Sequence, residues 1–154
     1  MDKKNIIIII LAIIVIALIV LIGSMFLNNT KNEVVIYNNT IDGLGTFNST
    51  NVTNFTLSDS SNNVQTNYIA NDTIAQVTTT SSSSAIEITI SEAEKVNDSA
   101  KGHTIYKNTA NMGEHKGEVR YFTILKDNDN QRYVMISTAD FNLTSMIVDS
   151  FKFF

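Results

Sequence analysis

The longest hydrophobic segment of the chain lies near its start. Residues 6–27 (IIIIILAIIVIALIVLIGSMFL) carry no charge, and the polar residues MDKKN precede them. A run of about 22 residues forms a helix roughly 33 Å long, and the hydrocarbon core of a bilayer is about 30 Å thick. Lipid favours a helix even for an isoleucine-rich segment, because the backbone hydrogen bonds must be satisfied within it. The pattern therefore predicts a transmembrane helix over residues 6–27.

The charges that flank this segment predict its orientation. Lys3 and Lys4 lie directly before the run, whereas the charges of Lys31 and Glu33 cancel after it. Because positive charges stay on the cytoplasmic side, residues 1–5 form a cytoplasmic tail and the rest of the chain is exported. The sequence thus predicts a single-pass protein of the cell membrane with an extracellular C-terminal domain.

Two other readings of the same segment remain open. A cleaved signal peptide has a hydrophobic region of about 7–15 residues and a small-x-small site. Here the run is longer, and Ile22-Gly23-Ser24 lacks a small residue at its first position. A prepilin normally has Gly or Ala next to its basic residues, whereas Asn5 follows Lys4 here. An uncleaved signal anchor is the interpretation that fits both observations.

Beyond a short polar tether at residues 28–33, apolar and polar residues mostly alternate, which is typical of strands. Residues 119–125 and 132–138 (RYVMIST) carry apolar side chains on both faces, and KDNDNQ separates them. They predict a β-hairpin at the centre of a sheet. Further strands are expected at residues 34–37 (VVIY), 86–90 (IEITI) and 103–106 (HTIY).

Residues 48–56 (NSTNVTNFT) form a polar segment that leads into a further apolar pair. Phe55 and Leu57 are spaced as in a strand, so residues 53–57 are predicted to be one, with these two side chains facing the core. Residues 58–67 and 81–84 (SSSS) read as loops, and DGLG at 42–45 reads as a turn.

Two helices are predicted among the strands. The first begins with Ser91 as its cap and Glu94 at the third position after it. The second lies near the C-terminus and has Asp140 or Asn142 as its cap. Its helical spacing is that of Leu143, Met146, Ile147 and Ser150. Residues 34–154 are therefore expected to form an extracytoplasmic α+β domain, an antiparallel sheet with one or two helices packed on it.

The order of these elements resembles the PsbP-type fold. The resemblance covers residues 86–153, from AIEITI to the C-terminal MIVDSFKF, in the order strand, short helix, strand, hairpin, helix and final strand. It implies a compact docking or accessory module without catalytic residues. PsbP-type domains usually open with a Pro-Gly-Trp-like turn, and this chain has neither Pro nor Trp. The layout of the whole chain also resembles small, single-span, asparagine-rich surface proteins of methanogenic archaea.

Composition excludes several classes of function. The net charge is −4 and no basic cluster is present, which argues against nucleic acid as a partner. The chain has no Cys, so disulfides, thiolate metal sites, cysteine catalysis and a lipoprotein anchor are excluded. An exported domain of this chain must therefore be stabilised by its hydrophobic core.

No pattern in the sequence predicts catalysis, a cofactor or a bound metal. His115 lies beside Glu114 and close to Glu118, but a metal site needs ligands in a fixed geometry, and NMGEHKGE reads as a loop. His103 is interpreted as a surface histidine as well. Asp127, Asp129 and Gln131 lack the Gly and Glu of a calcium loop and read as a polar hairpin turn. No Gly-x-Ser-x-Gly nucleophile elbow occurs.

The outer region carries eight Asn-x-Ser/Thr triplets, about twice the number that chance placement would give. Such triplets accept glycans only on an exported chain, and the predicted membrane anchor implies export. Within residues 48–56, Asn48 is expected to lie in a loop and to be the best acceptor of its group. The candidate N-glycosylation sites are Asn28, Asn38, Asn48, Asn51, Asn54, Asn71, Asn97 and Asn142.

Three functional hypotheses follow from these patterns. The first is a membrane-anchored structural or binding module at the cell surface, held in the bilayer through residues 6–27 and in contact with envelope components or a membrane protein. The second is a ligand-binding sensor or accessory subunit, which would need a partner because the cytoplasmic tail is about five residues long. The third, an envelope hydrolase, lacks a recognisable nucleophile or acid–base pair.

Overall fold

The structure is a computed structural model that describes residues 34–70, 74–110 and 115–154. Residues Val35–Phe154 form one compact unit. The predicted transmembrane helix, its tether and the sites Asn28 and Asn71 lie outside the described residues. Among the residues that are described, no helix has the length and hydrophobicity needed to cross a membrane.

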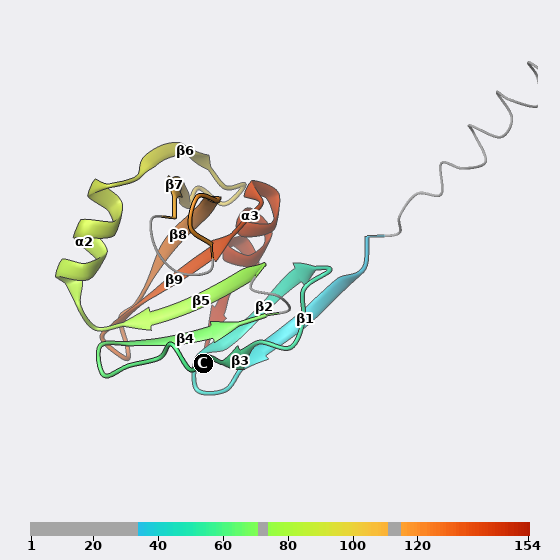
Figure 1. Cartoon of the computed structure of the whole chain (residues 1–154). Helices are drawn as coiled ribbons and strands as arrows, with labels where there is room; N and C mark the ends of the chain where they lie inside the picture. Colours follow the sequence, from blue (N-terminus) through green and yellow to red (C-terminus); the bar gives the residue numbers. More distant parts are fainter. Residues whose placement is uncertain (1–33, 71–73, 111–114) are drawn as a thin grey trace, which may run out of the picture. The chain divides into compact units, whose positions relative to one another are not determined.

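Two antiparallel sheets make up most of the unit (Figure 1). The small sheet has the order β1-β2-β10, and the large sheet has the order β3-β4-β5-β9-β8-β7-β6. The strands of the small sheet are β1 (Ile36–Ile41), β2 (Gly45–Thr50) and β10 (Lys152–Phe153). Those of the large sheet are β3 (Thr56–Leu57), β4 (Gln65–Ile69), β5 (Ala75–Thr80), β6 (Glu94–Asp98), β7 (Thr104–Thr109), β8 (Val119–Asp127) and β9 (Arg132–Thr138).

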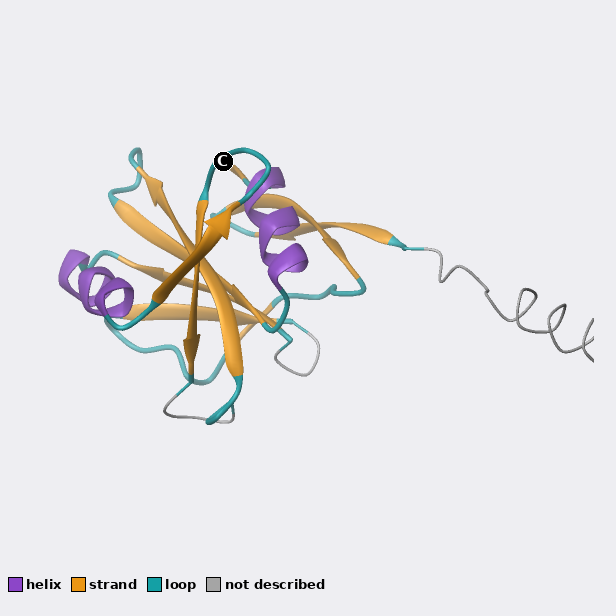
Figure 2. Ribbon diagram, turned by 90° about the horizontal axis from the view of Figure 1, so that it is seen from above, coloured by secondary structure: helices purple, strands orange, loops and turns teal. Residues whose placement is uncertain are grey.

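The two helices are α2 (Ser83–Ser91) and α3 (Phe141–Ser150), and they lie on opposite sides of the large sheet (Figure 2). Strands dominate and all pairings are antiparallel, so the predicted α+β class with packed helices is confirmed for the described residues.

The predicted hairpin at residues 119–138 is confirmed. Strands β8 and β9 pair from Tyr121↔Thr138 to Asp127↔Arg132, and both have a neighbour on their other side. Their central position explains the apolar residues on both faces, because each face of the sheet is covered. Val134 and Ile136 point to one face, and Phe122, which lies opposite Ser137, points to the other.

The C-terminal helix is also confirmed, and its cap is Asp140. The side chain of Asp140 accepts a hydrogen bond from the backbone N–H of Leu143, which satisfies one of the free donors of the first turn. Leu143, Ile147 and Val148 are buried on the side that faces the sheets. Met146, predicted to share the apolar face, is only half-buried.

The hydrophobic core lies between the large sheet, the small sheet and α3. Val77, Val134 and Ile136 line the large sheet, while Phe47 of β2 and Ile147 of α3 close the core from the opposite side. The ring of Phe47 contacts the rings of Phe55 and Phe151, with centroids 5.0 and 5.5 Å away. Both sheets therefore share one hydrophobic core, and the small sheet is an integral part of the domain.

The prediction of a strand at residues 86–90 is wrong. These residues belong to α2, and the serines at 81–84, predicted to be a loop, begin it: Ser82 is the N-cap and accepts from the N–H of Ala85. Ile86 is buried, whereas Ile88 points to solvent and is 58 % exposed. The helix predicted from Ser91 is also wrong, because Ser91 ends α2 and the next residues enter β6.

Topology explains this correction. Strand β5 pairs with β4 and β9, whereas β6 pairs with β7 at the far edge of the same sheet. The connection must cross β9, β8 and β7, and a helix is the usual way to cover that distance with its backbone satisfied. Of the element order that carries the PsbP-type resemblance, the first two elements are therefore wrong: residues 86–90 are helical and residues 94–98 form β6, whereas β7, the β8–β9 hairpin, α3 and β10 follow in the expected order.

The remaining predictions hold with shifted bounds. Strands form near residues 34–37 and 103–106, although β1 begins at Ile36, and residues 42–44 form the predicted turn. The predicted loop at 58–67 ends earlier, because β4 starts at Gln65. The strand predicted at 53–57 is reduced to two residues, and the prediction that Leu57 faces the core is wrong, because its side chain is 63 % exposed. Phe55 does pack against the core, as predicted.

Candidate functional site

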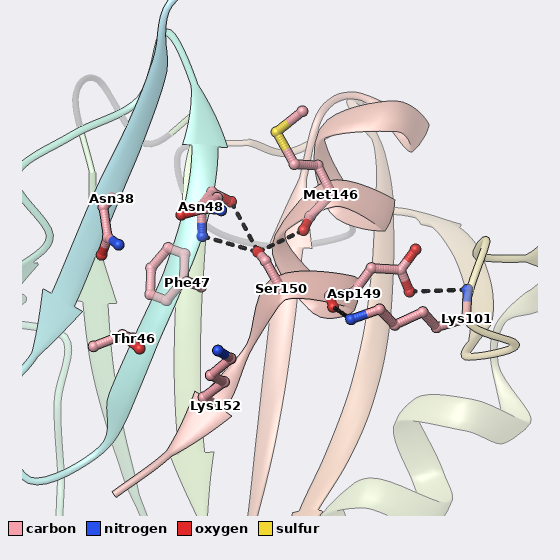
Figure 3. Close-up of a pocket in the computed structure, with 9 residues that line it drawn as sticks. All are labelled: Asn38, Thr46, Phe47, Asn48, Lys101, Met146, Asp149, Ser150 and Lys152. Atoms are coloured by element: carbon pink, nitrogen blue, oxygen red, sulfur yellow. Dashed lines mark hydrogen bonds between the residues drawn. The ribbon is translucent and has the colours of Figure 1, made fainter.

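A polar cleft of about 360 Å³ lies where the outer face of the small sheet meets the C-terminal end of α3 (Figure 3). Its size is at the lower end of the range for small-molecule sites. Asparagine and threonine side chains of β1 and β2 form one wall, and the end of α3 forms the other. The lining residues are Asn38, Thr46, Phe47, Asn48, Lys101, Met146, Asp149, Ser150 and Lys152.

Hydrogen bonds from Ser150 join the two walls. Its hydroxyl accepts from the backbone N–H of Asn48 at 2.8 Å and donates to the carbonyl of Met146 at 2.7 Å (Figure 3). Serine at the end of a helix often bonds back to the preceding turn, and here the same oxygen also holds β2. The position of β2 against α3, and hence the width of the cleft, is fixed by this contact.

Asp149 organises the third side of the cleft. Its carboxylate accepts from the hydroxyl of Ser99 at 2.5 Å and from the backbone N–H of Lys101 at 3.3 Å. The ammonium group of Lys101 donates to the carbonyl of Asp149 at 2.5 Å. A cation at this position also stabilises the negative end of the α3 dipole. The loop at residues 99–103 is thereby fastened to the end of α3.

The polar groups of the cleft include both donors and acceptors. Lys152 extends from β10 and is exposed, and among the described residues no carboxylate lies within ion-pair distance of it. Together with the amides of Asn38 and Asn48 and the carboxylate of Asp149, it offers partners for a small polar ligand.

Two of the predicted glycosylation sites, Asn38 and Asn48, meet at this cleft. They are directly opposite each other in the pairing of β1 with β2, so their side chains lie on the same outer face. The prediction that Asn48 lies in a loop is wrong. It is half-buried in β2, which is paired on both sides. Asn38 is exposed on an edge strand, and so is Thr40 of its triplet.

The other described candidates are scattered over the domain. Asn51 and Asn54 are exposed, and both have φ of 59°, a left-handed conformation that Asn tolerates better than most residues. Asn97 is exposed on β6, but the Ser99 of its triplet is buried and bound to Asp149. Asn142 is exposed in the first turn of α3, and the triplet's Thr144 is buried.

A second cavity, of about 190 Å³, lies between α2 and the large sheet. Thr89 of α2 lines it together with Phe122, Met135 and the buried Arg120. Burial lowers the pKa of Arg120 from its ordinary value, and the charge of Glu118 opposes this. The guanidinium group donates to the carbonyls of Ile74 and Ser137 at 3.3 Å and has a further interaction, so it is a bound structural cation.

His115 also lines this second cavity. Its Nδ1 lies 2.8 Å from the carboxylate of Glu118, and its Nε2 is buried with no hydrogen-bond partner among the described residues. A histidine oriented by a carboxylate provides two of the three groups of a hydrolytic triad, and no hydroxyl of the described residues bonds to Nε2 here. His103, on the loop before β7, donates its backbone N–H to Ser99.

The turn at residues 127–131 is polar, as the sequence indicates. Asp127 is 3 % exposed and accepts from the side chains of Asn130 and Arg132, so its carboxylate is engaged within the turn. Among the described residues, no group of three His, Asp or Glu side chains could hold a metal ion.

Comparison of the chain with protein-family models, with curated proteins and with solved structures gives no match. The cleft residues outside the Asn triplets, chiefly Lys101, Asp149 and Lys152, were not predicted from the sequence. They come from a loop, a helix end and a short strand that only the fold brings together. The one local signal is the alternation of charge and apolar residues in DSFKF, which marks the end of α3.

Proposed function

We propose that this chain is a membrane-anchored binding or structural module of the cell surface. The observation that supports it most is the closeness of two segments. The uncharged run at residues 6–27 is followed, only seven residues later, by a compact domain that begins at Val35. In this proposal residues 6–27 span the bilayer, residues 1–5 are cytoplasmic and the domain is extracellular.

The character of the described domain supports a binding role over an enzymatic one. Its cleft is lined by amides, hydroxyls, two lysines and a carboxylate, and the histidine–carboxylate pair elsewhere has no hydroxyl partner among the described residues. Envelope components or a neighbouring membrane protein would be the partners. A PsbP-like docking module, as the resemblance over residues 86–153 implies, is part of the proposal.

Glycosylation of the domain belongs to the same proposal. A transferase that acts on the folded domain needs an exposed Asn and an exposed Ser or Thr two residues later. Asn38 with Thr40, and Asn54 with Thr56, meet both conditions. Asn48, Asn97 and Asn142 do not, since part of each triplet is half-buried or buried. We therefore propose Asn38 and Asn54 as the main acceptors of the described part.

The topology can be tested with single cysteines, because the chain has none of its own. Asp42→Cys places a thiol at the exposed turn between β1 and β2, and Asn5→Cys places one in the predicted tail. A membrane-impermeant maleimide should label Asp42→Cys in intact cells and Asn5→Cys only after lysis. Labelling of Asn5→Cys alone in intact cells would reverse the orientation, and protection of both would contradict surface exposure.

A second candidate function is supported by the cleft itself. A ligand-binding accessory subunit would use the cleft of Figure 3, whose polar groups come from three regions far apart in the sequence, residues 38–48, residue 101 and residues 146–152. Affinity purification of the full chain from membranes would distinguish the two functions. A membrane protein recovered in fixed ratio, and lost on Lys152→Glu but not on Lys126→Glu, favours the accessory subunit. Lys126 is an exposed lysine outside the cleft and serves as the matched control.

A further inference from the structure

The first half of β1 has an unusual burial pattern. Val35, Ile36 and Tyr37 are 46, 60 and 38 % exposed, although they are consecutive and apolar. Successive side chains of a strand point to opposite faces, so both faces are open to solvent here. Farther along the strand the buried side chains are Asn39, which donates to the hydroxyl of Ser49 at 2.8 Å, and Ile41. Three consecutive apolar residues thus lie outside, while an amide of the same strand lies inside, which is unusual.

This apolar patch, Val35–Tyr37, is different from the other exposed apolar residues of the described chain. Apart from Val34, which adjoins the patch, those occur one at a time along the sequence, for example Val64, Ile88 and Phe154. Single exposed apolar residues are normal on a protein surface, whereas a contiguous group indicates a contact. No charged residue lies between Val34 and Ile41. The patch begins the domain, at the outer margin of the small sheet in Figure 1.

The length of the preceding chain indicates what covers the patch. Only residues 28–34 separate it from the uncharged run that ends at Leu27. Seven residues extend to at most about 25 Å, at about 3.3–3.6 Å per residue. The patch must then lie within that distance of the bilayer, whose headgroup zone is itself several ångströms deep. Tyr and aliphatic side chains are favoured in this zone.

We propose that Val35–Tyr37 contacts the interfacial zone of the lipid bilayer and holds the domain against the membrane surface. The inference rests on the proposed anchor at residues 6–27. A second copy or a partner strand added to the free edge of β1 would satisfy backbone groups but leave the side chains on both faces exposed. A lipid surface can accept them, because its interface accommodates apolar side chains without a matching shape.

A tryptophan probe tests the contact, because the chain contains no Trp. The full chain would be reconstituted into phosphatidylcholine vesicles, with and without brominated acyl chains, which quench tryptophan at the interface. Ile36→Trp carries the probe in the patch, and Ile88→Trp on α2 is the control, since the two positions are 60 and 58 % exposed. Tyr37→Trp is a second, conservative probe. We expect Trp emission at 36 and 37 to be largely lost in brominated vesicles and emission at 88 to be unchanged.

Three results would overturn the proposal, and they can be told apart. If probes 36 and 37 escape the bromines and are quenched by aqueous acrylamide, the patch faces water. If they are shielded from both quenchers, a protein surface covers them, either a second copy or a partner. If the full chain fails to float with the vesicles at all, the anchor itself is wrong and the proposed function falls together with the contact.

Discussion

Replacement of Asp127 by Asn removes the charge from a carboxylate that organises the β8–β9 turn. Asp127 accepts from the Arg132 Nε at 2.8 Å, from the Asn130 side chain at 2.9 Å and from the Asn130 backbone at 3.2 Å. Arg132 in turn donates to the carbonyl of Gly43 at 2.8 Å, which links the hairpin to the β1–β2 turn. An amide of the same shape keeps one acceptor but places its NH₂ group against two donors.

The expected cost follows from these contacts. A hydrogen bond to a charged group contributes about 1.5–3 kcal/mol, and two are lost here. Arg132 and Asn130 are partly open to water and can recover some solvation. We therefore expect Asp127→Asn to lower the free energy of unfolding by about 2–3 kcal/mol, which is less than the sum of about 3–6 kcal/mol for the two bonds because of this recovered solvation. The substitution leaves no cavity, because Asp and Asn have nearly the same volume.

The effect should depend on pH in a defined direction. Burial raises the pKa of Asp127, and the hydrogen bonds from Asn130 and Arg132 lower it by more, so the pKa lies below its ordinary value. A lowered pKa contributes stability that is present above the unfolded-state pKa of about 3.9 and is lost as the pH falls through the folded-state value. The difference between wild type and Asp127→Asn should thus shrink in acid.

Urea unfolding followed by far-UV circular dichroism measures both effects, at neutral pH and below the lowered pKa. Asp129→Asn is the matched control, because Asp129 is exposed in the same turn and no hydrogen bond or ion pair to its side chain occurs among the described residues. It should change stability by less than about 0.5 kcal/mol. Equal losses for the two variants, or a difference that grows in acid, would refute the reasoning.

Three further substitutions test other parts of the structure. Phe47→Ala should lower the free energy of unfolding, measured in urea, by about 3–5 kcal/mol, because the ring fills the core shared by both sheets. A loss below about 1 kcal/mol would mean that the small sheet packs only loosely on the rest of the domain. Gly45→Ala should cost about 1–3 kcal/mol, because its Cβ would lie 2.3 Å from the carbonyl oxygen of Lys152; unchanged stability would contradict the close pairing of β2 with β10. For glycosylation, intact mass of the natively expressed protein should fall by one glycan in Thr56→Ala and stay unchanged in Thr50→Ala, and the opposite pattern would restore Asn48 as the acceptor.

Elements with a long or doubly buried pattern were predictable from the sequence. The β8–β9 hairpin has apolar residues on both faces of two strands, and α3 has helical spacing with a capping residue ahead of it. In both cases the local pattern and the packing agree. The class of fold follows from such elements, because their type constrains how layers can be built.

The helix α2 could not be predicted, and its residues show why. Ile86 and Ile90 are four residues apart and share a helical face, but Ile88 completes an equally good alternation for a strand. The topology of the sheet favours the helix over the strand, because the chain must cross three strands between β5 and β6. The serines that precede the segment are a capping signal, with Ser82 as the residue used. The cleft could not be predicted from the sequence either, because the residues that line it are spread from position 38 to position 152.

The pairing of β10 with β2 has a consequence for the order in which the domain is made. Lys152 lies opposite Thr46, a residue more than 100 positions earlier in the chain. In an anchor-first protein the β1–β2 hairpin emerges on the outer face early, and β2 then has an open edge until residue 152 has been translocated. Such distant pairings form slowly, and an open edge invites pairing with other chains. Under the proposed topology, a chain that lacks Lys152 and Phe153 would therefore keep one edge of β2 unpaired after export, and we expect it to associate with other chains more readily than the full chain.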